Sequence, residues 1–204
     1  TRVAQQAGGT TAPEMSSHGL LDEVTYLVEQ PVPLAGAFDK KYLTLPREVL
    51  LASMAKYQRV FAIESKGKIL PKLVAMLEGT PKRPAEVKKV IERILNARLA
   101  DSLIFWADDL TRPLTTSDLS GVTFHERLGS MEEKAKRLEQ LSAPLAKAWS
   151  LGRDECAQLQ QACRLAKTDL VTSMVKEFPT LQGVVVKYYA LHAGEPRAVA
   201  DAIE

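Results

Sequence analysis

The sequence is short of the residues that usually hold metals, disulfides or membrane anchors. Only two cysteines and three histidines occur among its 204 residues. No apolar run approaches the roughly 18 residues that a membrane-spanning helix needs. The first residues are small and polar, with no apolar stretch ahead of a cleavage pattern, so we expect no signal peptide. The histidines, His18, His125 and His192, are scattered and show no zinc-ligand spacing.

The two cysteines lie too far apart to be joined. Cys156 and Cys163 are seven residues apart in an expected helix, so a rise of about 1.5 Å per residue separates their backbones by about 10 Å. A disulfide requires Cα atoms within about 7 Å of each other. We therefore expect both thiols to be reduced and buried, which suits a cytoplasmic protein.

The net charge of +2 hides an uneven distribution along the chain. Residues 40–93 hold 13 Lys or Arg against five Glu, a net charge of +8. Residues 1–39 hold one Arg against five Asp or Glu, a net charge of −4. Concentrated positive charge attracts polyanions such as nucleic acids. The alternative is a set of solvated helix and hairpin faces, and composition alone leaves both open.

The first half of the chain predicts a mixture of strands and helices. Residues 1–19 are rich in Gly, Thr, Ser and Gln, which indicates a mobile lead-in or loop. Residues 24–38 predict strands, with Pro31 and Pro33 marking an edge or a bulge. A helix is expected from Pro46 to about Tyr57. Residues 60–63 and 69–77 predict two strands of a hairpin that turns at 65–68. A Gly followed by Lys in this turn could suggest a phosphate loop, but the Walker pattern is absent.

The second half predicts helices. After Pro84 a long helix carries an apolar row that we expect in the core, reinforced by Ile94 and Trp106: Val87, Ile91, Leu95, Leu99 and Leu103. Ser130 and Glu133 predict a capping box, followed by a helix that ends near Gly152. Its expected apolar face is Met131, Leu138, Leu141, Leu145 and Trp149. Further helices are expected at about 154–167, 169–177 and 183–192, and from Pro196.

Periodicity breaks between residues 112 and 128, where Pro113, a Thr/Ser run and Gly121 occur. We therefore expect three parts. They are a lead-in at residues 1–19, an α+β body domain at 20–120, and a helical domain at 121–204.

A series of motifs along the chain carries a resemblance. The motifs that carry it most clearly are LLDEVT (20–25), LPREVL (45–50), QRVF (58–61), GKILP (67–71), ERILNARLAD (92–101), AKTDLVT (166–172), EFP (177–179), LQG (181–183) and YYA (188–190). Shorter matches lie between them, such as FD (38–39), FW (105–106), VTF (122–124) and LGS (128–130). In this order they resemble the β subunit of bacterial glycyl-tRNA synthetases, over roughly residues 20–204. The resemblance implies an internal fragment of a longer subunit.

The resemblance implies an α+β fold whose N-terminal mixed part is followed by an all-α, HD-like part. It also implies a cytoplasmic, non-catalytic part of glycine–tRNA ligase that positions tRNA-Gly for ATP-dependent glycylation. The α subunit, in a heterotetramer or fused in one chain, would hold ATP and Mg²⁺. No cofactor is expected in this fragment, and neither a membrane nor DNA is an expected partner. The class II motifs for ATP are absent from the sequence, so we expect no catalytic residue here.

HD-like helices raise the hypothesis of a metal-dependent phosphohydrolase, which needs an adjacent His-Asp pair among its ligands. The sequence has no such dipeptide, and Asp169 follows Thr168. We expect Asp169 to cap a helix or pair with a cation, and we expect no metal site.

If the basic segment binds tRNA, we expect seven cations to contact phosphate or ribose: Arg47, Lys56, Arg59, Lys66, Lys68, Lys89 and Arg93. Lys89 and Arg93 share a helix face, being four residues apart. Tyr57 is expected in the core or at its rim, with base stacking as the alternative. Arg98 and Asp101 are spaced to pair with each other. The alternative to a role in tRNA binding is that the fragment is a purely structural spacer.

Overall fold

The computed structural model describes residues 2–17 and 19–204, and it divides into two compact units, Thr1–Ile104 and Phe105–Glu204. A mixed α and β unit comes first and a mostly helical unit follows, as expected. The division falls within the long helix α5 (Pro84–Leu110), earlier than the predicted boundary at 112–128. The reason is that the last turns of α5 pack into the second unit, where Trp106 contacts the rings of Tyr188 and Tyr189.

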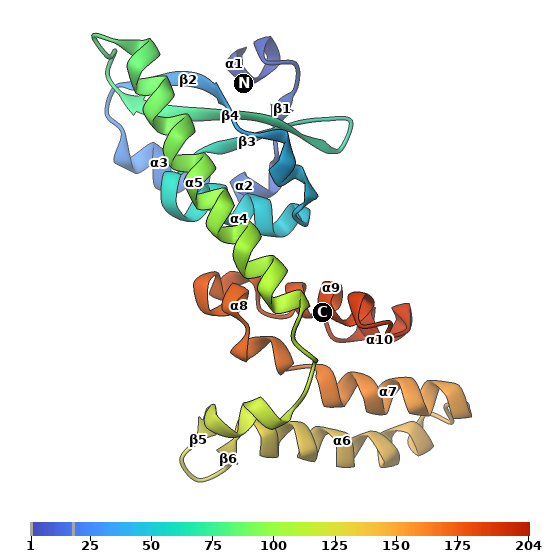
Figure 1. The fold of residues 1–204 in the computed structure, drawn as a ribbon. Helices are drawn as coiled ribbons and strands as arrows, with labels where there is room; N and C mark the ends of the chain where they lie inside the picture. The colour runs from blue at the N-terminus through green and yellow to red at the C-terminus, as the bar shows by residue number, and fades with distance from the viewer. Residues whose placement is uncertain (1, 18) are drawn as a thin grey trace. The chain divides into compact units, whose positions relative to one another are not determined.

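The first unit is built on a four-stranded antiparallel sheet with the order β1-β3-β4-β2 (Figure 1). The strands are β1 Thr10–Thr11, β2 Pro31–Ala37, β3 Phe61–Ser65 and β4 Lys68–Glu78. Pro31 and Pro33 lie on β2, which pairs with β4 at the edge of the sheet, as their missing N–H groups predict. The β3–β4 hairpin is confirmed, and it turns through Lys66 and Gly67, whose φ values of +51° and +75° are left-handed.

The helices of the first unit are α1 Arg2–Gln6, α2 Pro13–Ser17, α3 Leu20–Leu27, α4 Arg47–Gln58 and the part of α5 up to Ile104, with a 3₁₀ turn η1 at Lys40–Thr44. In Figure 1, α5 crosses one face of the sheet. Glu92 of α5 accepts the N–H of Ala37 at 2.8 Å, and Asn96 accepts that of Asp39 at 2.9 Å. Leu95 and Leu99 are fully buried as predicted, but Ile94 is 39% exposed.

Two expectations for the N-terminal region need correction. Residues 2–17 form α1, β1 and α2 instead of a loop, because Ala4, Ala12 and Met15 pack into the core and β1 pairs with β3. Within the same expected lead-in, Thr1 and His18 lie outside the described residues, and Gly19 is the residue before α3. Residues 24–27 were expected in a strand and instead complete α3, whose Leu20 and Val24 lie one helical turn apart on its buried side.

The second unit contains the short strands β5 Thr123–His125 and β6 Gly129–Ser130, and several helices that follow the end of α5. The helices are α6 Met131–Ala148, α7 Arg153–Leu165, α8 Ser173–Glu177, α9 Val184–His192 and α10 Arg197–Ala202. Turns of 3₁₀ helix occur at η2 Ser117–Gly121, η3 Thr168–Val171 and η4 Pro179–Leu181. The predicted capping box of Ser130 and Glu133 opens α6. Figure 1 shows α6 and α7 side by side, with the β5–β6 hairpin at the start of α6.

The expected apolar face of α6 is only partly buried. Met131 is buried and Leu138 is half-buried, whereas Leu141, Leu145 and Trp149 are 55%, 43% and 64% exposed. Small side chains, Ala135, Ser142 and Ala146, take the buried positions of α6. Ala135 packs with Leu119 of η2, and α7 lies alongside the helix. Cys156 and Cys163 are free thiols and only half-buried, not buried as expected. None of the described helices is long and apolar enough to cross a membrane.

Candidate nucleic-acid interface

Arg47, at the start of α4, is held by two carboxylates within the first unit. Its Nε and one terminal nitrogen each donate to Glu14 at 2.8 Å, and that terminal nitrogen also donates to Glu64 at 2.5 Å. Its other terminal nitrogen donates to the carbonyl of Gly67 at 3.3 Å. The Glu14 carboxylate, with Glu64, holds the pKa of Arg47 above its usual range. The charge of Arg47 is therefore neutralised inside the protein, and the residue ties α2, α4 and the β3–β4 hairpin together.

Arg59 also has a protein partner. It ends α4 in a left-handed conformation, and its guanidinium forms an ion pair with Glu23 of α3. The Arg59 side chain is 48% exposed, so solvent screens this pair.

Tyr57 lies half-buried at the rim of the first unit, as expected, between two cations. The ammonium of Lys56 is 4.8 Å and the guanidinium carbon of Arg98 is 5.0 Å from the centre of its ring. Cations over an aromatic face are attracted by the electrons of the ring. Arg98 also pairs with Asp101 at 3.5 Å, as its spacing predicts.

Four of the seven candidate cations are exposed and form no ion pair with any residue that the structure describes. Lys66 and Lys68 flank Gly67 at the tip of the β3–β4 hairpin. Lys89 and Arg93 lie on the outer side of α5, away from the row that contains Leu95. On the same helix, Lys88 pairs with Glu92 at 3.8 Å and Arg83 with Glu86 at 3.3 Å.

These four cations form two separate groups. Lys66 and Lys68 lie where β4 begins, while α5 starts beyond the other end of that strand. Eleven residues of strand span about 33 Å, so the hairpin tip and the first turns of α5 lie near opposite ends of the sheet (Figure 1). A nucleic acid that contacted both groups would have to lie along the length of the sheet.

Two buried aspartates in the second unit organise helix ends. Asp109 is 4% exposed and accepts the N–H groups of Ser173 and Met174, both at 2.8 Å, and the hydroxyl of Tyr189 at 3.0 Å. Burial, followed by the Asp109 charge, raises the pKa of Tyr189 above its usual range. Asp109 was not predicted from the sequence; it lies seven residues after Ser102, and both side chains are buried on α5.

Asp169 is fully buried, and its Oδ2 accepts the N–H of Gly183, the residue before α9, at 2.6 Å. Asp169 lies inside η3 and not at the start of a helix, so the expected cap is not observed, and the carboxylate instead ties η3 to the residue before α9. Its other oxygen, Oδ1, has no hydrogen-bond partner, and burial raises the pKa of this carboxyl above its usual value.

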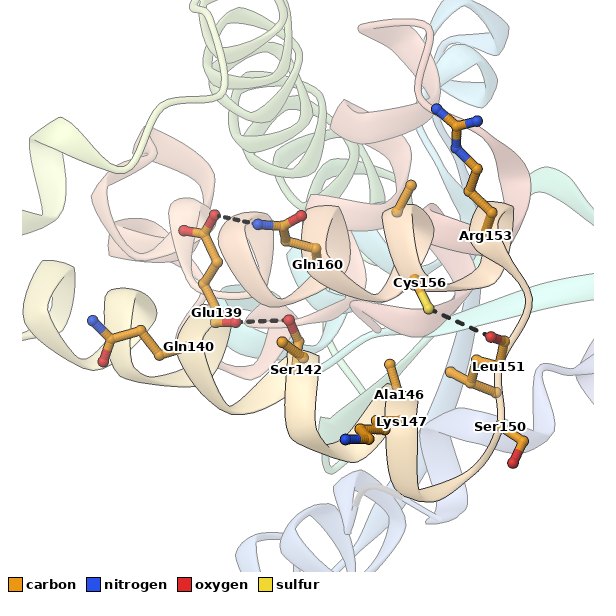
Figure 2. A pocket seen from close by; sticks show the side chains of 12 residues that line it. Glu139, Gln140, Ser142, Ala146, Lys147, Ser150, Leu151, Arg153, Cys156 and Gln160 are labelled. Atoms are coloured by element: carbon orange, nitrogen blue, oxygen red, sulfur yellow. Dashed lines mark hydrogen bonds between the residues drawn. The ribbon is translucent and has the colours of Figure 1, made fainter.

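A hollow of about 880 Å³ lies elsewhere, between α6 and α7 (Figure 2). Glu139 accepts a hydrogen bond from Gln160 at 3.1 Å at one end, and Lys147 and Arg153 lie toward the other. None of the seven candidate cations lines it. Across residues 2–17 and 19–204, no three His, Cys, Asp or Glu side chains gather as they would around a metal ion.

Comparison with known proteins identifies the kind of protein to which this fold belongs. The profile of a family of synthetase subunits, described as "Glycyl-tRNA synthetase beta subunit", matches residues 1–204. The glycine–tRNA ligase β subunit of Nitratidesulfovibrio vulgaris (strain Miyazaki F) is 46% identical over 97% of this chain. Those of Moorella thermoacetica and Streptococcus gordonii are 39% and 44% identical over 100% and 90%.

The chain therefore belongs to the glycyl-tRNA synthetase β subunit family. It spans 28–29% of the length of these three relatives.

Proposed function

We propose that this chain is a non-catalytic part of glycine–tRNA ligase that contacts the tRNA backbone and holds it for the α subunit. The observation that carries the proposal is membership of the β subunit family along the whole chain. The four exposed cations without carboxylate partners support it, because unneutralised Lys and Arg release counterions when they meet phosphates.

The contact proposed here positions tRNA and does not read its sequence. Lys66 and Lys68 lie on a hairpin tip, and Lys89 and Arg93 lie on an exposed helix face, so all four are accessible to a phosphate backbone. Because the two groups lie near opposite ends of the sheet, each would contact a different stretch of the RNA. Contacts of this kind fix orientation and carry no base specificity.

In the assembly proposed here, the α subunit joins glycine to tRNA-Gly and holds the ATP and Mg²⁺ that the reaction needs. The chain studied here would work in the cytoplasm as part of an α and β heterotetramer or of a fused chain. We also propose that the second unit is an HD-like helical domain.

The test is filter binding of tRNA-Gly between about 50 and 200 mM salt, a range over which phosphate contacts weaken steeply. The variant replaces Lys66, Lys68, Lys89 and Arg93 with Gln. Each lost phosphate contact reduces the slope of log affinity against log salt by about 0.7–0.9, so we expect a decrease of about 3. The matched control replaces four exposed arginines that already have carboxylate partners: Arg83, Arg98, Arg112 and Arg197. Equal slopes for the variant and this control would show that only net charge matters and would reject the proposed contacts.

The rival function is a structural spacer within the assembly. The neutralisation of Arg47 and Arg59 by Glu14, Glu64 and Glu23 favours it, because these cations stabilise the fold itself. A spacer predicts that the fourfold Gln variant, placed in the complete assembly, keeps the tRNA affinity of the unchanged protein.

A further inference from the structure

The tip of the β3–β4 hairpin extends beyond the rest of the sheet in the first unit (Figure 1). Among the described residues, β1 pairs with β3 no closer to the turn than Glu64, and β2 pairs with β4 no closer than Lys72. Residues 65–70 therefore form a two-stranded ribbon with its turn. A two-stranded ribbon has little stability of its own in water, so the tip needs support from outside the sheet.

The side chain of Arg47 supplies this support. One of its terminal nitrogens donates to the carbonyl of Gly67, in the turn itself, at 3.3 Å. The other donates to the carboxylates of Glu64 on β3 and Glu14 on α2. Hydrogen bonds from a charged donor are stronger than those between neutral groups. The guanidinium thus links the hairpin to α2 and α4, two helices whose apolar residues lie in the core of this unit.

The supported turn carries two cations that the first unit leaves free. Lys66 and Lys68 flank Gly67, and both are exposed. Lys66 and Gly67 have positive φ, as the central residues of a type I′ turn do, and Ser65 pairs with Lys68 across the turn. Because the turn holds both lysine backbones in one arrangement, fewer conformations are lost when their ammonium groups meet phosphates.

The charge of Arg47 itself is not available to a phosphate. Its side chain is 27% exposed, and one arginine faces two glutamates, so the cluster of Arg47, Glu14 and Glu64 has a net charge of −1. A cluster of this sign repels phosphate. Any effect of Arg47 on RNA binding must therefore act through the residues that it holds in place.

We propose that Arg47 is a positioning residue for tRNA, which fixes the β3–β4 turn so that Lys66 and Lys68 meet the phosphate backbone together. This inference rests on the proposed function, since it takes the two lysines as phosphate contacts. It gives Arg47 an indirect role in place of the direct contact expected from the sequence.

The substitution Arg47→Lys separates positioning from charge. Lysine keeps the net charge of the cluster, but its single ammonium group cannot reproduce the planar fork that reaches two carboxylates and the Gly67 carbonyl. The matched control is Arg59→Lys, which makes the same change at an arginine of the same unit that pairs instead with Glu23 of α3.

A double-mutant cycle of tRNA-Gly binding, measured by filter binding at about 50 mM salt, tests the inference. Arg47→Lys should weaken the affinity about fivefold, whereas Arg59→Lys should leave it unchanged. In a protein that already carries Lys66→Gln and Lys68→Gln, Arg47→Lys should change the affinity by less than about twofold. The reason is that no cations then remain for the turn to position.

Hydrogen exchange gives a second measurement that does not depend on RNA. Arg47→Lys should increase the exchange rate of the backbone amides of residues 64–69 at least about threefold, because the tip loses its support. The amides around Leu95 of α5 should keep their rates, and Arg59→Lys should change neither group.

Three results would overturn the positioning role. They are an unchanged affinity for Arg47→Lys, an unchanged exchange rate at the hairpin tip, and an equal loss of affinity with and without the two lysines. The last result would indicate direct contact or general destabilisation. In each case the proposed function stands as long as the two Gln substitutions lower the salt slope. If they change neither the affinity nor the slope, the proposed phosphate contact of the hairpin fails, and the positioning role fails with it.

Discussion

Arg47 shows how a single cation can stabilise the first unit while looking, in sequence, like a nucleic-acid contact. Its partner Glu64 has a side chain only 16% exposed, so removing the guanidinium leaves a carboxylate with little solvent. We predict that Arg47→Ala lowers the free energy of unfolding by about 2 kcal/mol. Urea denaturation followed by circular dichroism measures this value.

The matched control for Arg47→Ala is Lys68→Ala, which removes an exposed cation from the same unit. That change should alter the free energy of unfolding by no more than about 0.5 kcal/mol. Equal effects of the two substitutions would contradict the role assigned to Arg47.

Asp169 gives a prediction about pH. Burial raises the pKa of its carboxyl above the usual 3.8, so ionisation is harder in the folded than in the unfolded chain. The folded state therefore loses stability as the pH rises through this range. Asp169→Asn removes the charge and keeps an oxygen to accept the N–H of Gly183.

We predict that the stability of Asp169→Asn relative to the unchanged protein increases from about pH 3 to about pH 7, measured by urea denaturation at each pH. A pH-independent difference for Asp169→Asn would mean that this carboxyl titrates alike in both states.

Among the secondary-structure elements, the β3–β4 hairpin offers a substitution that should increase stability and weaken tRNA binding. Lys66 has a φ of +51°, a left-handed conformation that Asn adopts more readily than Lys, and Gly follows it as in the common Asn-Gly turn. We predict that Lys66→Asn raises the free energy of unfolding by about 0.5 kcal/mol.

The same substitution removes one proposed phosphate contact, so the salt slope of tRNA binding should fall by about 0.7–0.9. Thermal denaturation and filter binding on one preparation give both values. A variant with lower stability would show that the turn does not favour Asn, and an unchanged slope would remove Lys66 from the proposed interface.

Elements with strong local signals were predictable from the sequence. The capping box of Ser130 and Glu133, the hairpin turn at Gly67 and the buried positions Leu95 and Leu99 all follow from spacing within a few residues. The helix at residues 24–27 was missed because β-branched residues in so short a segment suggest a strand, while the packing of Val24 into the core decides otherwise.

The candidate site was less predictable because its electrostatics depend on contacts between distant residues. Arg47 meets Glu14, 33 positions earlier, and Glu64, 17 positions later. No local sequence pattern indicates ion pairs between residues so far apart. The net charge counted over residues 40–93 therefore overstated the positive charge that is available to a ligand. The exposure of Leu141, Leu145 and Trp149 on α6 was missed for a similar reason, since an apolar spacing predicts a face but not what covers it.

For the whole molecule, each unit contains hydrophobic clusters of its own among the described residues. The cluster of the first unit uses buried residues from Ala4 to Leu99, and two clusters of the second unit use buried residues from Leu119 to Ala135 and from Ala162 to Ile203. We predict that Leu95→Ala, which empties a fully buried position, destabilises the first unit by about 2–5 kcal/mol and splits the unfolding transition in two.

Tryptophan fluorescence distinguishes the two transitions, because both tryptophans, Trp106 and Trp149, belong to the second unit. Trp106 packs against Tyr189 with ring centres 5.1 Å apart, so its emission reports the unfolding of that unit. In Leu95→Ala the fluorescence midpoint should stay in place while part of the circular dichroism signal is lost at lower urea. Val186→Ala, in a core of the second unit, should shift the fluorescence midpoint instead. If Leu95→Ala moved both signals together, α5 would couple the two cores into one cooperative unit.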